Sequence, residues 1–204
     1  MTIGVVLFDM EGVLSHYDRA ARAARLAELT GTTPEAVREA IWDSGLEARA
    51  DAGELAPDVY LRALGELLGC AMDRDIWLAA RQASITPNDA AIALAARAAQ
   101  RCRIAVLTNN SRLVTDHLDL LNPPVARLFG ERVHASASFG AVKPAARAYL
   151  GCIEQLGATP PQTLFIDDSE TNVQGAREAG LHACCFVDVE TLERDLRRFG
   201  VLDD

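Results

Sequence analysis

The feature that most constrains the fold of this chain is the alternation of short apolar runs with helical patterns. The apolar runs span residues 3–9, 103–107, 132–136, 163–167 and 182–187. Between them, residues 88–100, 144–156 and 171–179 carry helical periodicity with Asn/Asp or Pro start signals and a Gly stop. Strands that alternate with helices pair in parallel and are covered on both faces. The sequence therefore predicts an α/β fold with a doubly wound, Rossmann-like parallel sheet.

The chain between the first two strands is far longer than a single crossover needs. Residues 15–83 contain four helical patterns with capping or stop signals, so they predict a small helical insertion over the sheet. We therefore expect a core of residues 1–14 and 84–204, with 15–83 as a helical cap. Within the cap, residues 43–54 have the composition of a solvated loop, although a loop there could equally supply specificity.

Length and charge limit the partners that this chain can bind. With 204 residues, of which 50% are hydrophobic, it can bury one full core with an insertion. The net charge of −9 argues against broad binding to nucleic acid or anionic membranes, so a small-molecule partner is expected. Its 5 cysteines lack CxxC spacing, which indicates neither a disulfide framework nor a zinc site. No signal peptide or membrane span is indicated, so a cytoplasmic location is expected.

Polar residues follow three of the predicted strands at the point where each strand ends. They are Asp9 and Glu11, then Thr108 and Asn109, then Asp167 and Asp168, while Lys143 precedes the fourth strand at a Lys-Pro pair. In an open parallel sheet, ligands bind beyond the carboxyl ends of the strands. We therefore expect these side chains to meet at one site.

Four carboxylates at one site repel one another unless a cation offsets their charge. Oxygen ligands with positions left for water and phosphate suit Mg²⁺ better than zinc. Thr108 and Asn109 can donate hydrogen bonds to a phosphate, whose charge Lys143 would help to neutralise. Lys143 is the single lysine among 20 basic residues, and its place at this edge favours a functional role.

This arrangement resembles the haloacid dehalogenase superfamily over the whole chain and in the right order. The resemblance implies that Asp9 is a nucleophile that forms an aspartyl-phosphate, and that it needs no activating base because aspartate is ordinarily ionised at neutral pH. Glu11 would protonate the leaving oxygen and then activate water. Asp9, the backbone carbonyl of Glu11, Asp167 and Asp168 would surround Mg²⁺. Asn172 would orient the loop that carries the last two aspartates.

The acid at position 11 departs from the aspartate that most phosphatases of the superfamily carry. The enolase-phosphatase branch has the same Asp-x-Glu-Gly form, whereas the dehalogenases place an aromatic residue there, so Glu11 favours phosphoryl transfer. The insertion resembles the small cap of sugar-phosphate phosphatases and of the phosphatase half of epoxide hydrolases, particularly at residues 53–64. We therefore expect a Mg²⁺-dependent phosphatase acting on a small phosphorylated metabolite, with a sugar phosphate as first guess. A phosphomutase, a 2-haloacid dehalogenase and a non-catalytic phosphate- or Mg²⁺-binding protein remain alternatives.

Several other polar and aromatic residues are expected to have structural roles. Asn110 and Ser111 are predicted to cap the helix that begins at Arg112. The 4 histidines show no metal-binding spacing, and His16 is predicted to be a solvated hinge residue. The two tryptophans, Trp42 and Trp77, are predicted to pack on apolar faces of the insertion helices.

Overall fold

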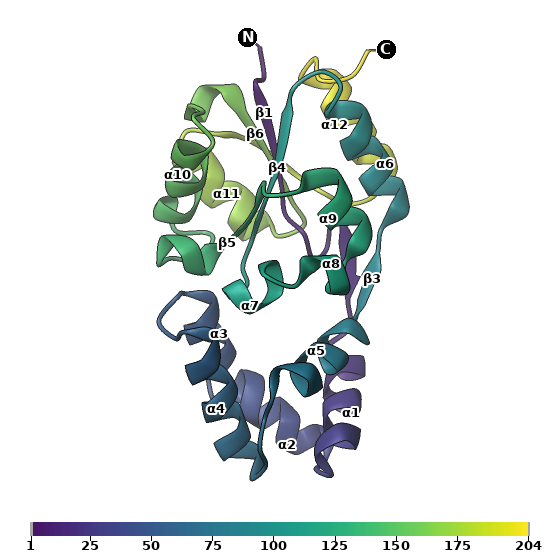
Figure 1. Cartoon of the computed structure of the whole chain (residues 1–204). Helices are drawn as coiled ribbons and strands as arrows, with labels where there is room; N and C mark the ends of the chain where they lie inside the picture. Colours follow the sequence, from purple (N-terminus) through teal and green to yellow (C-terminus); the bar gives the residue numbers. More distant parts are fainter. Residues whose placement is uncertain (1, 204) are drawn as a thin grey trace.

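The computed structural model describes residues 2–203 as an α/β core with a body of helices at one end of its sheet (Figure 1). The sheet has the strand order β5-β4-β1-β6-β7, and every neighbouring pair is parallel. In that order the strands are Val133–Ala135, Arg103–Thr108, Val5–Phe8, Thr163–Asp167 and His182–Cys185. All five fall within predicted runs or one residue beyond them. The predicted doubly wound parallel α/β fold is confirmed.

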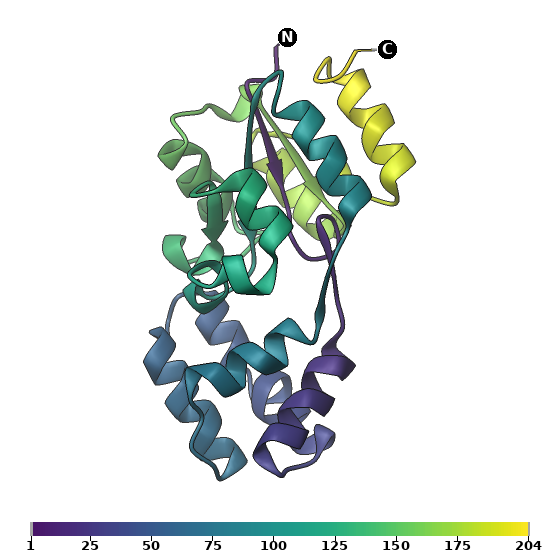
Figure 2. The ribbon, with the colours of Figure 1, turned by 45° about the vertical axis from the view of Figure 1, so that its right-hand side comes forward.

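Two layers of helices bury the two faces of the sheet. Along β1, Val6 and Phe8 join one apolar cluster and Leu7 joins the other, because successive side chains of a strand point to opposite faces. Helices α6, α9 and α12 cover the first face, and Figure 2 shows α6 beside α12. Helices α10 and α11 cover the second face. These five helices span Asp89–Ala98, Pro123–Phe129, Val189–Arg198, Ala146–Gln155 and Glu170–Glu178.

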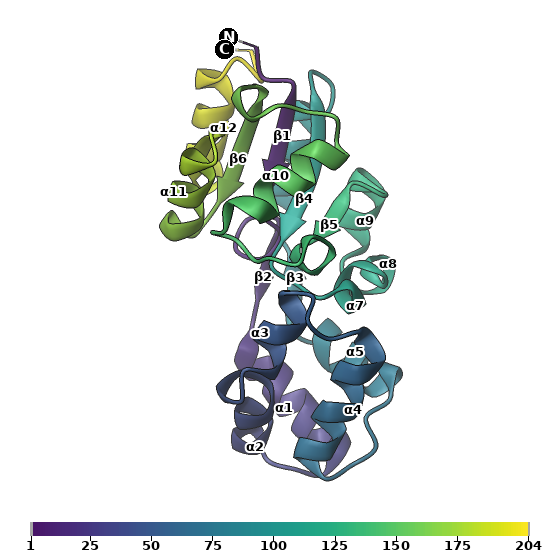
Figure 3. The ribbon, with the colours of Figure 1, turned by 90° about the vertical axis from the view of Figure 1, so that its left-hand side faces the viewer.

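The five helices α1 to α5, called the cap below, lie beyond the carboxyl ends of the strands (Figure 3). They span Arg19–Thr30, Pro34–Arg38, Leu46–Asp51, Pro57–Leu68 and Arg74–Gln82, and a π-helical turn covers Glu39–Asp43. A two-stranded antiparallel ribbon, β2 (Ser15–Tyr17) with β3 (Ile85–Pro87), joins the cap to the core. The division into residues 1–14 with 84–204 and residues 15–83 stays our proposal.

Three predictions about the cap can be compared with the structure. The solvated loop predicted for residues 43–54 is wrong in part, because Leu46 and Ala50 lie four residues apart and bury one face of helix α3. Trp77 is buried, as predicted, and its ring meets Tyr60 edge to face. His16 is exposed on β2, as predicted.

The remaining short helices connect the sheet strands. They are α7 (Arg112–Thr115), α8 (Leu118–Leu121) and the 3₁₀ turns Ser136–Phe139 and Pro160–Gln162. Among the described residues, none of the helices has the length and apolar character that crossing a bilayer requires.

Candidate active site

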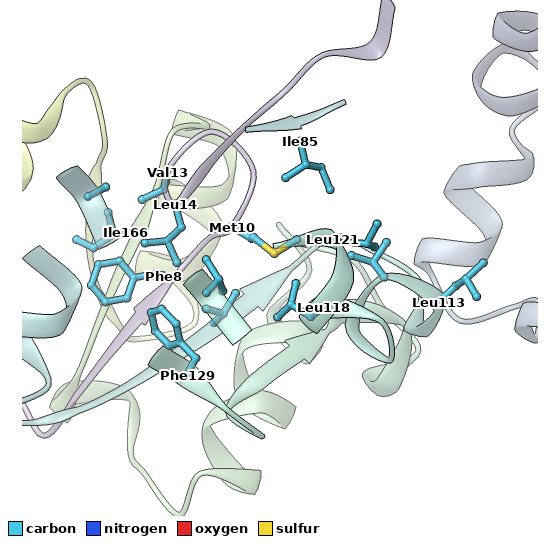
Figure 4. Packing of buried hydrophobic residues seen from close by; sticks show 14 of the residues in the cluster. Phe8, Met10, Val13, Leu14, Ile85, Leu113, Leu118, Leu121, Phe129 and Ile166 are labelled. Atoms are coloured by element: carbon cyan, nitrogen blue, oxygen red, sulfur yellow. The ribbon is translucent and has the colours of Figure 1, made fainter. Parts of the chain in front are cut away.

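The loop after β1 is fixed by the burial of Met10. Its side chain lies in the apolar cluster near Leu118 and Leu121 (Figure 4), and none of its surface is exposed. The backbone N–H of Asp9 donates to the carbonyl of Ile166 on β6 over 2.8 Å. The anchored strand end thus holds Asp9, which is 7% exposed, beside the end of its neighbour strand.

Gly12 allows this loop to approach the loop after β6. Its φ is 98°, in the region that favours glycine, and a Cβ atom there would lie 2.3 Å from the carboxyl group of Asp168. No larger side chain fits between these two loops without moving Asp168. The glycine after Glu11 is therefore a steric requirement of the site.

Lys143 lies between two carboxylates at the centre of the site. Its Nζ is 2.7 Å from Oδ1 of Asp9 and 2.7 Å from Oδ2 of Asp167, and the residue is only 3% exposed. Burial alone would lower the pKa of Lys143, but the two carboxylates raise it above its usual value. The ammonium is therefore charged and shared between Asp9 and Asp167.

One ammonium does not compensate two buried carboxylates. Burial raises the pKa of Asp9 to about 7, repulsion from Asp167 adds to this rise, and Lys143 opposes it. This differs from the sequence-based expectation of an aspartate that is fully ionised at neutral pH. A second cation beside Asp9 would favour the ionised form of its carboxyl group.

Asp167 is the last residue of β6 and Asp168 follows it, but their carboxyl groups have different surroundings. The buried carboxylate of Asp167 accepts hydrogen bonds from Lys143, from the N–H of Ser169 and from the side-chain amide of Asn172. Asp168 is exposed, and its pKa is raised by partial burial and by Asp167. Carboxylate oxygens of Asp9, Asp167 and Asp168 lie within 4.8 Å of one another, close enough to share one metal ion.

The position of Lys143 depends on contacts from two other elements. The side-chain amide of Asn109 donates to the carbonyl of Lys143 over 3.0 Å and accepts from its N–H over 2.8 Å. Gly175 of α11 leaves room for Pro144, because a Cβ atom at Gly175 would lie 2.5 Å from the Pro144 carbonyl oxygen. The side-chain amide of Asn109, expected on a phosphate, is thus occupied in holding Lys143.

Glu11 reaches out of the core and pairs with the cap. Nη2 of Arg81, on α5, donates to the Glu11 carboxylate and also to Oδ1 of Asn110 over 2.7 Å. Asn110 in turn donates to the hydroxyl of Thr108 over 2.7 Å. The guanidinium of Arg81 also lies 4.3 Å from the ring centre of Tyr17.

The prediction that Asn110 and Ser111 cap a helix is wrong for Asn110. Its amide joins the chain Arg81–Asn110–Thr108 instead. Ser111 occupies the N-cap position of α7, but its side chain makes no capping hydrogen bond there. Thr108 to Ser111 are four consecutive polar residues at the end of β4. Their spacing alone does not tell which of them cap a helix and which belong to a site.

The cap also contains a buried polar network that was not predicted from the sequence. Arg22 of α1 donates to Glu47 of α3 and, over 3.2 Å, to the hydroxyl of Tyr60, which itself donates to Glu47. Arg22 and Arg81 are 0% and 1% exposed. Arg81 stands four positions after Trp77 on the apolar face of its helix, a signal that a helical projection reveals.

A cavity of about 340 Å³ lies between the cap and the core, beside Glu11. It is lined by Glu11, Tyr17, Arg19, Trp42, Glu47, Ala48, Asp51, Arg81, Asn109 and Asn110. Trp42, predicted only to pack, is half-buried and contributes to this lining. A larger open hollow of about 850 Å³ lies between α4 and α5, but none of the predicted site residues lines it.

Comparison with known proteins identifies relatives across most of the chain. The sequence model of the haloacid dehalogenase-like hydrolase family matches residues 3–180. A phosphatase of Mycobacterium tuberculosis is 33% identical over 189 residues, which cover 90% of this chain and 87% of that protein.

Solved structures match the fold at lower identity. A HAD-like family hydrolase from Porphyromonas gingivalis matches with a TM-score of 0.81 and 23% identity, over 97% of this chain and 99% of that one. A HAD family enzyme of Bacteroides thetaiotaomicron, in complex with magnesium and inorganic phosphate, matches with a TM-score of 0.74 and 20% identity, over 93% and 98%. The strand-end residues, the fold and these matches agree, and the chain belongs to the haloacid dehalogenase-like hydrolases.

Proposed function

We propose that this protein is a Mg²⁺-dependent phosphatase that hydrolyses a small phosphorylated metabolite through an aspartyl-phosphate. The observation that carries the proposal is the buried Lys143 ammonium between Asp9 and Asp167, with the exposed carboxylate of Asp168 beside them. This is a site with a nucleophile, a fixed positive charge and ligands for a hard cation. Sugar phosphates are the first class to test.

The donor set fits magnesium. We assign direct contact with the ion to Asp9, Asp168 and the backbone carbonyl of Glu11. Asp167 was expected among the ligands, but it already accepts from three groups, and a carboxylate has about four acceptor positions. We therefore propose that Asp167 mainly holds Lys143 and adds negative charge. When bound, Mg²⁺ neutralises phosphate charge and draws electron density from phosphorus.

Asp9 and Glu11 carry out the two chemical steps of the proposed hydrolysis. A carboxylate oxygen of Asp9 attacks phosphorus while the P–O bond to the alcohol breaks, and Glu11 gives its proton to the leaving oxygen. Water then attacks the aspartyl-phosphate, its proton passes to Glu11, and inorganic phosphate leaves. The cycle returns Asp9 and Glu11 to their starting states.

Phosphate oxygens would be bound by Thr108, Asn109 and Lys143. The Thr108 hydroxyl can donate while it accepts from Asn110. We propose that Asn109 contributes its backbone N–H, because its side-chain amide is bonded to Lys143. Lys143 stabilises the charge that develops during transfer.

The pairing of Glu11 with Arg81 links the proton carrier to the cap. The extra methylene of glutamate allows this carboxylate to reach a side chain 70 positions away. We propose that substrate binding exchanges the Arg81 contact for the leaving oxygen of the substrate, so cap position controls when Glu11 acts.

Removal of the metal should stop the reaction. We expect EDTA to lower hydrolysis of p-nitrophenyl phosphate by at least ~100-fold, because the acidic site then repels the phosphate. Added Mg²⁺ should restore the rate and Ca²⁺ should not, since calcium requires more ligands at longer distances. The assay is absorbance of released nitrophenolate. Full activity of the metal-free protein would refute the metal assignment.

Two substitutions at Glu11 test proton transfer and side-chain length separately. We expect Glu11→Gln to lose at least ~100-fold in kcat, because glutamine keeps an oxygen for Arg81 but cannot transfer a proton. Glu11→Asp should stay within ~10-fold of the wild type. Steady-state kinetics on one phosphate ester measures both. Equal losses in the two variants would count against an acid–base role.

Product analysis distinguishes the alternative functions. A phosphomutase would return the phosphoryl group to its substrate, giving an isomer without free phosphate. A 2-haloacid dehalogenase would release halide without metal. A non-catalytic binding protein would turn over no ester in a panel of phosphorylated metabolites.

A further inference from the structure

The cavity between the cap and the core lies on the alcohol side of the proposed phosphate site. Glu11, the proposed proton donor to the leaving oxygen, is part of its wall. The opposite wall comes from α3, where Glu47, Ala48 and Asp51 face it. Whatever alcohol the phosphate carries would therefore contact α3.

Most charged groups of this cavity already have partners. Glu47 binds Arg22 and Tyr60, and Glu11 binds Arg81. Arg19, at the exposed beginning of α1, lies 5.5 Å from the ring centre of Trp42. Before a substrate enters the cavity, each of these groups therefore already has a contact inside the protein.

Asp51 is the exception. Within residues 2–203, its carboxyl group has no hydrogen bond or ion pair, although its backbone carbonyl accepts from Ser136 over 2.7 Å and fixes its place. The charges that act on it are two acids, Glu47 and Glu11, and two arginines, Arg81 and Arg22. The two arginines already pair with the two acids, Arg22 with Glu47 and Arg81 with Glu11, so neither is an ion-pair partner of Asp51.

The surroundings of Asp51 favour a positively charged ligand. Burial, followed by repulsion from Glu47, raises the pKa of Asp51 to about 8, so at neutral pH this carboxyl group is largely protonated unless a nearby cation compensates its charge. An ammonium would supply that compensation together with up to three hydrogen bonds. A second phosphate or a carboxylate on the substrate would be repelled by the ionised form of Asp51, and a hydroxyl would add no charge.

We propose that the substrate is a phosphate monoester whose alcohol part carries a primary amine, and that Asp51 binds this amine. The proposal rests on the proposed phosphatase function and names the substrate class of the same site. Amino sugar phosphates and amino alcohol phosphates share this chemistry, and they differ in the separation between nitrogen and phosphorus.

Paired substrates test the proposal. The wild type is assayed with glucosamine 6-phosphate against glucose 6-phosphate, and with 2-aminoethyl phosphate against 2-hydroxyethyl phosphate. We expect kcat/KM to favour the amine in at least one pair by about 10- to 100-fold, the range of a charge-assisted hydrogen bond. In Asp51→Asn, which keeps the size of the side chain, this ratio should fall close to one.

The matched control is Glu54→Gln, because Glu54 is exposed three residues later and its side chain pairs with Arg49 on the surface. Its amine-to-hydroxyl ratio should equal that of the wild type. No amine preference in either pair, or a ratio that Asp51→Asn leaves unchanged, would overturn the proposal.

Binding provides a measurement that does not need turnover. Calorimetry with 2-aminoethylphosphonate and 2-hydroxyethylphosphonate, in the presence of Mg²⁺, should show tighter binding of the amine to the wild type and no difference in Asp51→Asn. If p-nitrophenyl phosphate is not hydrolysed, the phosphatase function fails, while the phosphonates still decide the role of Asp51. Equal binding of both phosphonates to the wild type would count against amine recognition.

Discussion

The Asp9→Asn variant should retain the fold and hydrolyse phosphate esters at least ~10⁴-fold more slowly than the wild type. An amide has the size of the carboxylate but is neither charged nor able to form an acyl-phosphate. In the structure, Asp9 is 7% exposed and held by Lys143 and the N–H of Met10, so the replacement alters the chemistry at a fixed position. Release of inorganic phosphate measures the loss.

Chemical trapping tests directly for the proposed aspartyl-phosphate intermediate. Reduction of an aspartyl-phosphate with borohydride converts that residue to homoserine, which mass spectrometry locates in a peptide. We expect homoserine at position 9 in the wild type during turnover and none in Asp9→Asn. Asp58→Asn is the matched control, because Asp58 lies exposed on the cap and should keep both activity and labelling. Full activity in Asp9→Asn would disprove the covalent mechanism.

Substitution of the single lysine should affect stability and activity together. Lys143→Met leaves Asp9 and Asp167 facing each other without their shared ammonium, and breaking a buried pair costs about 3–5 kcal/mol of unfolding free energy. The loss of positive charge at the phosphate site should lower kcat by about 10²–10³-fold. Urea unfolding followed by circular dichroism, and hydrolysis of p-nitrophenyl phosphate, measure the two effects.

Lys143→Arg separates charge from shape. It keeps the positive charge, so we expect part of the stability to return, but a planar guanidinium cannot replace a compact ammonium between two carboxylates 2.7 Å away on each side. Its activity should therefore remain low. A Lys143→Met protein with unchanged unfolding free energy and activity would contradict the central role of this ion pair.

The structure also revises the view of Asp9 that its residue type suggests. An exposed aspartate is ionised at neutral pH, but burial and Asp167 bring the pKa of Asp9 to about 7. Full ionisation of Asp9, the proposed nucleophile, therefore depends on positive charge next to it. Lys143 supplies one such charge, and the proposed Mg²⁺ would supply the second.

The parallel sheet and the place of the site could be predicted from the sequence because both depend on local patterns. Apolar runs of strand length alternating with capped helices permit few arrangements other than a covered parallel sheet, and that fold places the carboxyl ends of its strands at one edge. Asp9, Thr108 and Asp167 stand directly at those ends, so their convergence follows from strand position.

The contacts between cap and core were decided only by tertiary structure. Arg81 meets Glu11 across 70 positions, and Asp51 enters the same cavity from a segment whose composition indicated a solvated loop. Their places depend on how five cap helices pack on one another and how the β2–β3 ribbon directs them over the sheet. Which residues stand at the strand ends follows from the local pattern of strands and helices. The charge, burial and partner of a side chain depend instead on packing between segments that are far apart in the sequence.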